Sequence, residues 1–208
     1  MHLVLLSPPA FDPRECWLVE AMVAEGLDRY HVRKPGVTAE GLRTWLAQFS
    51  ERVRGTLVLH QHHELVEEFG LLGRHWRDDG SAPARPAQGR FASRSCHDLL
   101  GLTGKYDGYQ AVLAAPVFPS ISKPGHGPRF GTDWLAWMRV YSSLGDQSAQ
   151  RRAPVYALGG VDVSRVRACR EAGFGGVAAL GAVWGVQDPL KAYLELRDAV
   201  EDRGVANR

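Results

Sequence analysis

Strand-like and helix-like segments alternate along the whole chain, which predicts an α/β fold with a parallel sheet. The clearest unit lies near the C-terminus, where the apolar runs Pro154–Gly160 and Gly175–Ala182 flank a helical segment, Asp162–Gly173. About eight such units fit within residues 1–208, without a linker or a low-complexity tract. We therefore expect one domain, a single (β/α)8 TIM barrel with parallel strands.

The first half of the chain supplies four of these units. Strands are expected where short apolar runs end at polar or turn residues, and helices where apolar residues recur on one face. The expected strands are Leu3–Ser7, Arg29–Arg33, Thr56–His60 and Leu72–Trp76. The expected helices are Arg14–Glu25, one helix from Thr38 to Val53, and His63–Phe69.

In the second half, two stretches are too rich in Pro and Gly for regular structure. Asp78–Gly89 is expected to be a loop in place of a helix, and Phe118–Pro128 is expected to be a functional loop. The remaining expected elements are the strands Arg90–Ser95 and Tyr109–Pro116, the helix Asp133–Ser143, and a last helix from Asp188.

The composition excludes several classes of protein. The chain has 25 Lys and Arg against 23 Asp and Glu, a net charge of +2, which gives no argument for a nucleic-acid or membrane partner. Its apolar runs are far shorter than the ~20 residues that span a bilayer. Three widely spaced cysteines form neither a disulfide framework nor a CxxC metal pattern. We expect a cytoplasmic protein.

Function in such a barrel belongs to the C-terminal ends of the strands. Cations, hydroxyls and glycine amides occur there, and together they suit a phosphate or diphosphate ligand, although a single hydroxyl often only caps a loop. These candidates are His31, Arg33, His60, His62, His75, Ser95, Ser120, Ser122, Lys123, Gly159, Gly160 and Gly181.

Two groups of residues could hold a metal ion. Strand alternation would place His60 and His62 on one face, and His31 or His75 could add a third nitrogen. Ordinary polar residues lining a pocket are the alternative. Asp78 and Asp79 offer the oxygen ligands that Mg²⁺ takes, or are simply solvated.

Several sequence motifs resemble those of a known protein family. The strongest are Ala115–Lys123, with its Ser-x-Ser-Lys sequence, Ala157–Val161 and Gly173–Ala182. Weaker matches are Tyr30–Lys34, Leu59–Leu65, Gly73–Trp76 and Ser93–His97. Over nearly its whole length, the chain resembles the thiamine phosphate synthase superfamily, which includes the thiazole tautomerases.

The resemblance implies a transferase of thiamine biosynthesis that binds small phosphate and diphosphate substrates. In a synthase, a hydroxymethylpyrimidine diphosphate loses diphosphate, and the nitrogen of a thiazole phosphate traps the resulting cation. By position, Arg33 would bind the diphosphate, Lys123 would neutralise it as it leaves, and Ser95 would lie near the pyrimidine. Further binding positions are Lys34, Ser120 and Ser122, with the amides of Gly159, Gly160 and Gly181 for the thiazole phosphate.

The chain also departs from that family. The second-strand motif, usually Arg-Glu-Lys, reads Arg33-Lys34-Pro35, which displaces the second cation. His60-Gln61-His62 stands where the family has Asn-Asp-Asp with a Mg²⁺ ligand, and a second Mg²⁺ aspartate is expected near Gly80. Asp78 and Asp79 are the remaining candidate ligands for Mg²⁺.

These departures leave two alternatives to the synthase. A thiazole tautomerase needs an acid/base rather than Mg²⁺. Its catalytic histidine belongs where this chain has Pro116, so a histidine that titrates near neutral pH would have to come from His60, His62, His75 or His126. A binder of thiazole phosphate without catalysis is the other alternative. Each of these functions is compatible with a homo-oligomer.

Overall fold

The structure is a computed structural model that describes residues 1–97, 106, 108–119, 133–143 and 153–201. Eight parallel strands close into a barrel in chain order, because β8 pairs with β1 through the register from His2–Gly176 to Leu5–Ala179. The strands are β1 His2–Leu6, β2 Tyr30–Val32, β3 Leu57–Leu59, β4 Gly73–Trp76, β5 Phe91–Cys96, β6 Ala111–Ala114, β7 Val155–Leu158 and β8 Gly176–Ala179. The expected (β/α)8 fold class is confirmed.

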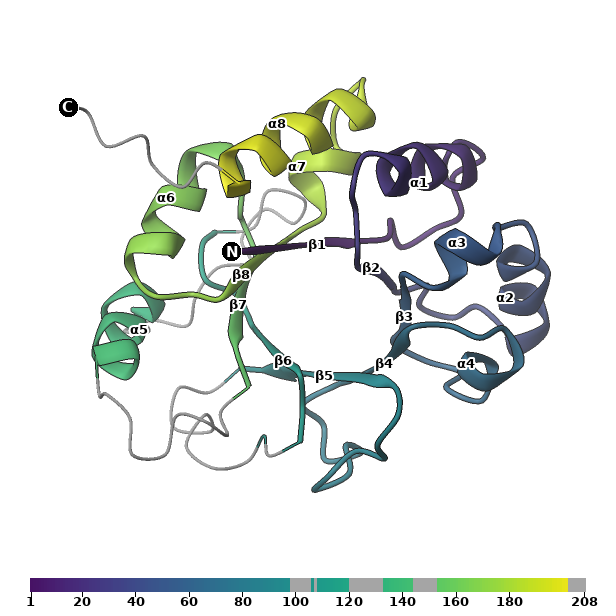
Figure 1. Ribbon diagram of the computed structural model, residues 1–208, viewed down its shortest axis with the longest axis horizontal. Helices are drawn as coiled ribbons and strands as arrows, with labels where there is room; N and C mark the ends of the chain where they lie inside the picture. Colours follow the sequence, from purple (N-terminus) through teal and green to yellow (C-terminus); the bar gives the residue numbers. More distant parts are fainter. Residues whose placement is uncertain (98–105, 107, 120–132, 144–152, 202–208) are drawn as a thin grey trace.

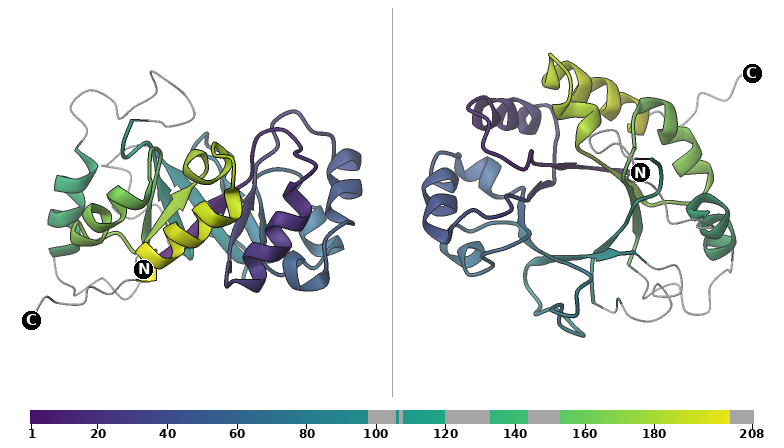
Figure 2. Two further views of the ribbon diagram at one scale, coloured as in Figure 1. Left: turned by 90° about the horizontal axis from the view of Figure 1, so that it is seen from above. Right: turned by 180° about the vertical axis from the view of Figure 1, so that it is seen from behind.

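Helices surround the ring of strands on its outer surface, as seen down the barrel in Figure 1 and from the side in Figure 2. The described helices are α1 Glu15–Ala24, α2 Ala39–Leu46, α3 Glu51–Arg54, α4 Leu65–Glu68, α5 Trp134–Ser143, α6 Val163–Glu171, α7 Gly181–Trp184 and α8 Pro189–Glu201. Residues 77–90 contain no helix, as their Pro and Gly content predicts. None of these helices has the length and apolar character needed to cross a bilayer.

The single helix expected from Thr38 to Val53 is instead two helices. Thr38 caps α2, where its hydroxyl accepts a hydrogen bond from the amide of Gly41 at 3.1 Å. Ser50 then caps α3 by accepting one from Val53 at 3.3 Å. A serine that accepts an amide hydrogen bond in this way starts a new helix. Both helices still bury the predicted apolar side.

The main core lies between strands and helices, and the barrel interior is divided in two. Apolar side chains of β1 and β6–β8 fill one side, and they are Val4, Leu6, Ala111, Leu113, Tyr156 and Ala178. On the other side, β2–β5 bring buried polar residues together, among them His31, His75 and Ser93. At the N-terminal end of the strands, the Arg29 guanidinium lies over the Phe91 ring at 5.0 Å and donates to the Tyr156 hydroxyl at 2.6 Å. This end is therefore closed, and access to the polar side is from the other.

Candidate active site

Three buried histidines meet inside the barrel. His31 lies in β2, His75 in β4, and His60 directly follows β3. Each offers a ring nitrogen within 4.8 Å of the other two. His31 Nδ1 and His60 Nε2 are 3.0 Å apart, and the rings of His60 and His75 stack with centroids 4.0 Å apart. We call these three residues the histidine cluster. The sequence named each member, and the barrel brings them together.

Two serines of β5 fix the ring of His75. Its Nδ1 is 2.9 Å from the hydroxyl of Ser93, and its Nε2 is 2.9 Å from that of Ser95. Ser93 and Ser95 are two residues apart on one strand, so both face the interior. His75 therefore orients Ser95, the serine that the sequence placed near a pyrimidine.

Burial controls the protonation of the histidine cluster. Desolvation, with a smaller effect from Arg29, lowers the pKa of His31 to about 3. Desolvation also lowers the pKa of His60 and of His75 well below 6.5, helped by the neighbouring imidazoles and by arginines at the open end. All three rings are therefore neutral at pH 7. The expectation that His60 or His75 titrates near neutral pH is wrong for this reason.

Two arginines lie at the open, C-terminal end of the barrel, which we call the mouth. The pKa of the half-buried Arg33 is lowered by desolvation and by the charge of Arg77. Among the described residues, no hydrogen-bond or ion-pair partner is found for the Arg33 guanidinium. A cation without a partner, close to a second cation, is suited to binding a doubly charged anion.

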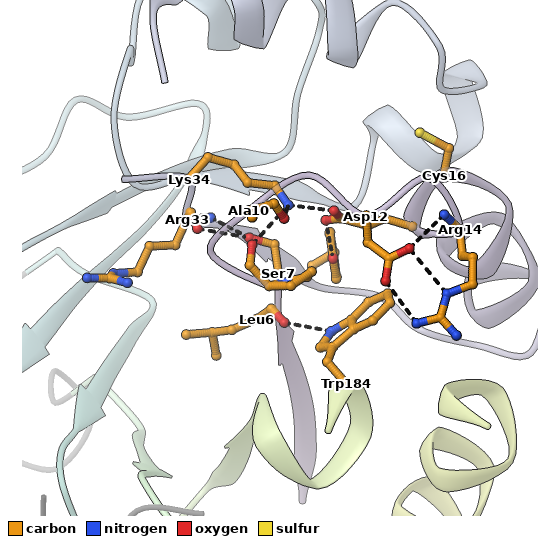
Figure 3. A network of polar contacts seen from close by, with 12 residues as sticks. Leu6, Ser7, Ala10, Asp12, Arg14, Cys16, Arg33, Lys34 and Trp184 are labelled. Atoms are coloured by element: carbon orange, nitrogen blue, oxygen red, sulfur yellow. Dashed lines mark hydrogen bonds and ion pairs between the residues drawn. The ribbon is translucent and has the colours of Figure 1, made fainter. Parts of the chain in front are cut away.

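Lys34 does not join Arg33 at the mouth. Figure 3 shows the two side chains leaving the end of β2 in opposite directions. The Lys34 ammonium donates to the carbonyls of Pro8 and Ala10, each at 2.9 Å, and to Glu15 at 2.5 Å. Burial lowers the pKa of Lys34 and raises that of Glu15, and the opposite charge of each partner counters the shift. The structure therefore gives Lys34 a place in the packing of the β1–α1 connection rather than in the site.

His62 is also separated from the cluster, against the expectation that it shares a face with His60. The strand ends at Leu59, so alternation no longer applies, and His62 has a left-handed backbone with φ 53°. Its Nε2 lies 2.8 Å from the carbonyl of Val37, outside the barrel interior. Gln61 donates to the carbonyl of Lys34 at 2.5 Å. Of this segment, only His60 reaches the site.

The two candidate aspartates for Mg²⁺ do not converge. Asp78 accepts from the Arg94 guanidinium at 3.0 Å and from the amide of His97 at 3.4 Å. Asp79 accepts from the hydroxyl of Ser81 at 2.5 Å and from its amide at 3.0 Å. Within the described part of the chain, the histidine cluster is the one group of three potential metal ligands.

The glycine turns lie where the sequence expects them, at the ends of β7 and β8. Gly159 and Gly160 have φ values of 92° and 65°, and the described residues provide no acceptor for their amides. Gly181 begins α7 and lines a hollow of about 450 Å³ between α6 and α8. The carboxylates of Asp162 and Glu195 also line this hollow. An anion is therefore better placed on the amides than inside the hollow.

Three predicted site residues, Ser120, Ser122 and Lys123, lie outside the described residues. The structure instead adds Ser93 and Arg77, which the sequence reasoning missed. Arg77 directly follows β4, so its position at the C-terminal end of a strand could have identified it.

Comparison with known proteins decides the family. A family model described as thiamine monophosphate synthase matches residues 3–183. The chain belongs to this family. Thiamine-phosphate synthases of Neisseria meningitidis and Methylococcus capsulatus are 27% and 31% identical to it over 210 and 146 residues. The first alignment covers 94% of this chain and 98% of the relative, and the second covers 67% and 61%.

Solved structures show the same fold. The thiamine phosphate pyrophosphorylase of Bacteroides thetaiotaomicron superposes with a TM-score of 0.78 at 24% identity, covering 98% of this chain and all of that one. That of Pyrococcus furiosus superposes with a TM-score of 0.72 at 19% identity, covering 96% and 95%.

The Mg²⁺ that the family resemblance implies fits the described residues poorly. Mg²⁺ takes oxygen ligands in a near-octahedral arrangement. At the third strand, this member of the thiamine monophosphate synthase family offers the imidazole of His60 and an amide already bonded to Lys34. Asp78 is paired with Arg94. No oxygen-donor site for Mg²⁺ is assembled by the part of the chain that the structure describes.

Proposed function

We propose that this protein is a transferase of thiamine biosynthesis that joins a hydroxymethylpyrimidine diphosphate to a thiazole phosphate and releases diphosphate. The family match over residues 3–183 carries the proposal. The mouth of the barrel supports it, because Arg33 holds a positive charge there, close to Arg77 and without a partner among the described residues.

The described residues divide the work of binding. Arg33, with Arg77 close by, binds the diphosphate and holds the developing negative charge as the bond to the pyrimidine breaks. Ser95, oriented by His75, contacts the pyrimidine. The amides of Gly159, Gly160 and Gly181 receive the thiazole phosphate. Gly159 and Gly160 have left-handed backbones that let amides approach an anion closely, and Gly181 begins α7. Lys123, Ser120 and Ser122 complete the diphosphate site in this proposal.

The tautomerase alternative is less well supported. It needs a histidine whose pKa is close to the working pH. His60 and His75 lie at the site, but burial keeps both neutral, while His62 is bonded to a carbonyl away from it. His126, the fourth candidate, lies outside the described residues. Neutral imidazoles instead suit hydrogen bonding to a substrate or coordination of a metal ion.

The test measures thiamine phosphate formed from the two substrates, by mass spectrometry, with Mg²⁺ and with EDTA. Arg33→Met is expected to lower the rate by about 100-fold or more, as loss of a group that stabilises developing charge does. Arg43→Met is the matched control, because Arg43 pairs with Glu40 and Glu68 on the outside of α2. Its rate should stay within about twofold of wild type. Absence of product from protein that binds thiazole phosphate would refute the proposal and favour the non-catalytic binder.

Other properties stay predictions. A requirement for Mg²⁺, which the family resemblance implies, is also a prediction; the described residues do not assemble a site for it, and the EDTA arm above tests it. A cytoplasmic location and a homo-oligomer also stay predictions, the latter to be checked by light scattering.

A further inference from the structure

We propose that His31, His60 and His75 bind a single transition-metal ion of the Zn²⁺ type inside the barrel, below the mouth. The inference goes beyond the transferase proposal and does not depend on it. It starts from three imidazoles, contributed by β2, β4 and the end of β3, whose ligand nitrogens lie within 4.8 Å of one another.

The geometry is close to that of a metal centre. Zn²⁺ binds histidine nitrogen at about 2.0–2.1 Å, so three ligand nitrogens of a tetrahedral site lie roughly 3.3 Å apart. One pair here, His31 Nδ1 and His60 Nε2, is already 3.0 Å apart. All three ligand nitrogens lie within 4.8 Å of one another, so each would have to move by about 1 Å or less to reach this spacing.

The donors are in the protonation state that a metal requires. A histidine ligand must be neutral, because the metal takes the lone pair that a proton would occupy. Burial keeps all three rings unprotonated at neutral pH. Three nitrogens without a carboxylate favour Zn²⁺, Co²⁺ or Ni²⁺ over Mg²⁺, and three histidines with an open fourth position form a known type of catalytic zinc site.

Two further features of the cluster point to a ligand. His31 Nε2 is buried and has no hydrogen-bond partner among the described residues, which is costly for a polar atom. An ion bound to this nitrogen, as the alternative to the Nδ1 that faces His60, would satisfy it. His75 has a serine hydroxyl at each of its nitrogens. Whichever nitrogen binds the ion, the other keeps a serine that fixes the ring, as the outer ligands of metal sites do.

The charges around the cluster favour one type of fourth ligand. Arg29 lies on the closed side of the cluster, and Arg33 and Arg77 lie on the open side. These cations oppose a bare dication, so the fourth ligand should be an anionic oxygen, either hydroxide or an oxygen of a bound phosphate. His60, which is 9% exposed, gives the ion a route from the mouth.

The experiment uses the full chain, purified without a histidine tag, stripped with EDTA and then exposed to Zn²⁺ or Co²⁺ alone. After desalting, elemental analysis should find about one ion per chain, and Co²⁺ should give the intense visible bands of a four-coordinate site. His60→Asn is expected to lose the bands and to weaken binding by at least 100-fold. Ser93→Ala and Ser95→Ala each keep all three ligands, and the one that removes the hydrogen bond from the free nitrogen of His75 is expected to weaken binding 10- to 100-fold.

His97→Asn is the matched control. His97 lies outside the cluster, with its Nδ1 2.7 Å from the carbonyl of Ala115, so the variant should bind Co²⁺ as wild type does. A wild-type chain that retains less than 0.1 ion, on the order of background, or that gives only octahedral Co²⁺ bands, overturns the proposal. Equal losses in His97→Asn and His60→Asn overturn it too. The wild-type result is decisive even if a variant fails to fold.

Discussion

Two adjacent residues, Arg33 and Lys34, carry like charges and have opposite environments. Because successive side chains at the end of a strand point to opposite faces, Arg33 turns to the mouth and Lys34 turns outward under the β1–α1 connection (Figure 3). There Lys34 is 1% exposed and its ammonium contacts Glu15, whose other oxygen accepts from the Tyr30 hydroxyl at 2.6 Å. One charge is therefore free for a ligand, and the other is used to hold the fold together.

The first prediction concerns this buried ion pair. Lys34→Met should lower the free energy of unfolding by about 3–5 kcal/mol, because it leaves the Glu15 carboxylate buried without its cation. Arg167→Met is the control, since Arg167 pairs with Glu171 on the exposed face of α6 and its loss should cost about 0.5 kcal/mol or less. Urea unfolding measures both. Equal effects would show that Lys34 is not held as the structure has it.

The second prediction is a loss of stability in mild acid. The histidines of the cluster have native pKa values below 6.5, about 3 for His31, whereas in the unfolded chain they titrate near 6.5. As pH falls from 6.5 to 5, the unfolded state gains protons that the native state does not. The free energy of unfolding of metal-free protein should therefore fall, by up to about 1.4 kcal/mol per pH unit for each histidine.

Removal of one histidine isolates this effect. His75→Gln cannot take up that proton when it unfolds, so its stability should depend less steeply on pH, by up to about 1.4 kcal/mol per unit. Urea unfolding in EDTA at four pH values between 6.5 and 5 gives both slopes. If His75→Gln kept the wild-type slope, His75 would be titrating normally in the native state.

At the scale of elements, the turn after β7 is fixed by close packing against the segment after β6. A Cβ on Gly160 would lie 2.1 Å from the carbonyl oxygen of Pro119, and one on Gly159 would lie 2.9 Å from Pro116. The backbone of Phe118 also donates to the carbonyl of Gly159 at 3.1 Å. The glycines that present amides at the mouth are therefore needed for packing as well, before any ligand is considered.

The third prediction separates two reasons for a glycine, a left-handed backbone and close packing at the missing Cβ. Gly36 has φ 81° with open space around its missing Cβ, so Gly36→Ala should cost only backbone strain, about 1–2 kcal/mol. Gly160→Ala adds the clash with Pro119 and should cost a further 1–3 kcal/mol or so. Thermal unfolding of the two variants checks the difference. Matching losses would mean that the segment after β6 yields to the extra methyl group.

Sequence periodicity located the elements well where the physical signal is local. The strand–helix–strand unit at the C-terminus and the helix-free segment 77–90 follow from apolar runs and from Pro and Gly content. Periodicity failed where a single hydrogen bond sets the end of a helix. At Ser50, such a bond divides a continuous apolar face into α2 and α3. At His62, alternation was extended one residue pair beyond the end of β3. Such endpoints depend on capping and turn geometry, which a pattern of hydrophobicity does not record.

On the scale of the whole molecule, barrel closure explains why the site could be predicted only in part. His31, His60 and His75 are up to 44 residues apart, and the parallel pairing of β2, β3 and β4 brings them together inside the barrel. The sequence named these residues without showing that they touch. The orphaned nitrogen of His31 and the pairing of Lys34 with Glu15 depend on contacts between side chains, and no spacing rule contains them.

The last prediction tests whether residues 1–208 form one cooperative domain. A closed barrel has no edge at which to divide, because β1 needs β8 as well as β2, so loss of one strand exposes both neighbours. Six tryptophans report on the whole ring, and they are Trp17, Trp45, Trp76, Trp134, Trp137 and Trp184. Unfolding in urea, followed by tryptophan fluorescence and by far-ultraviolet circular dichroism, should give one transition with the same midpoint. Two separate transitions would show that part of the barrel unfolds independently. The histidine cluster would then be lost in the transition that unfolds β2–β5.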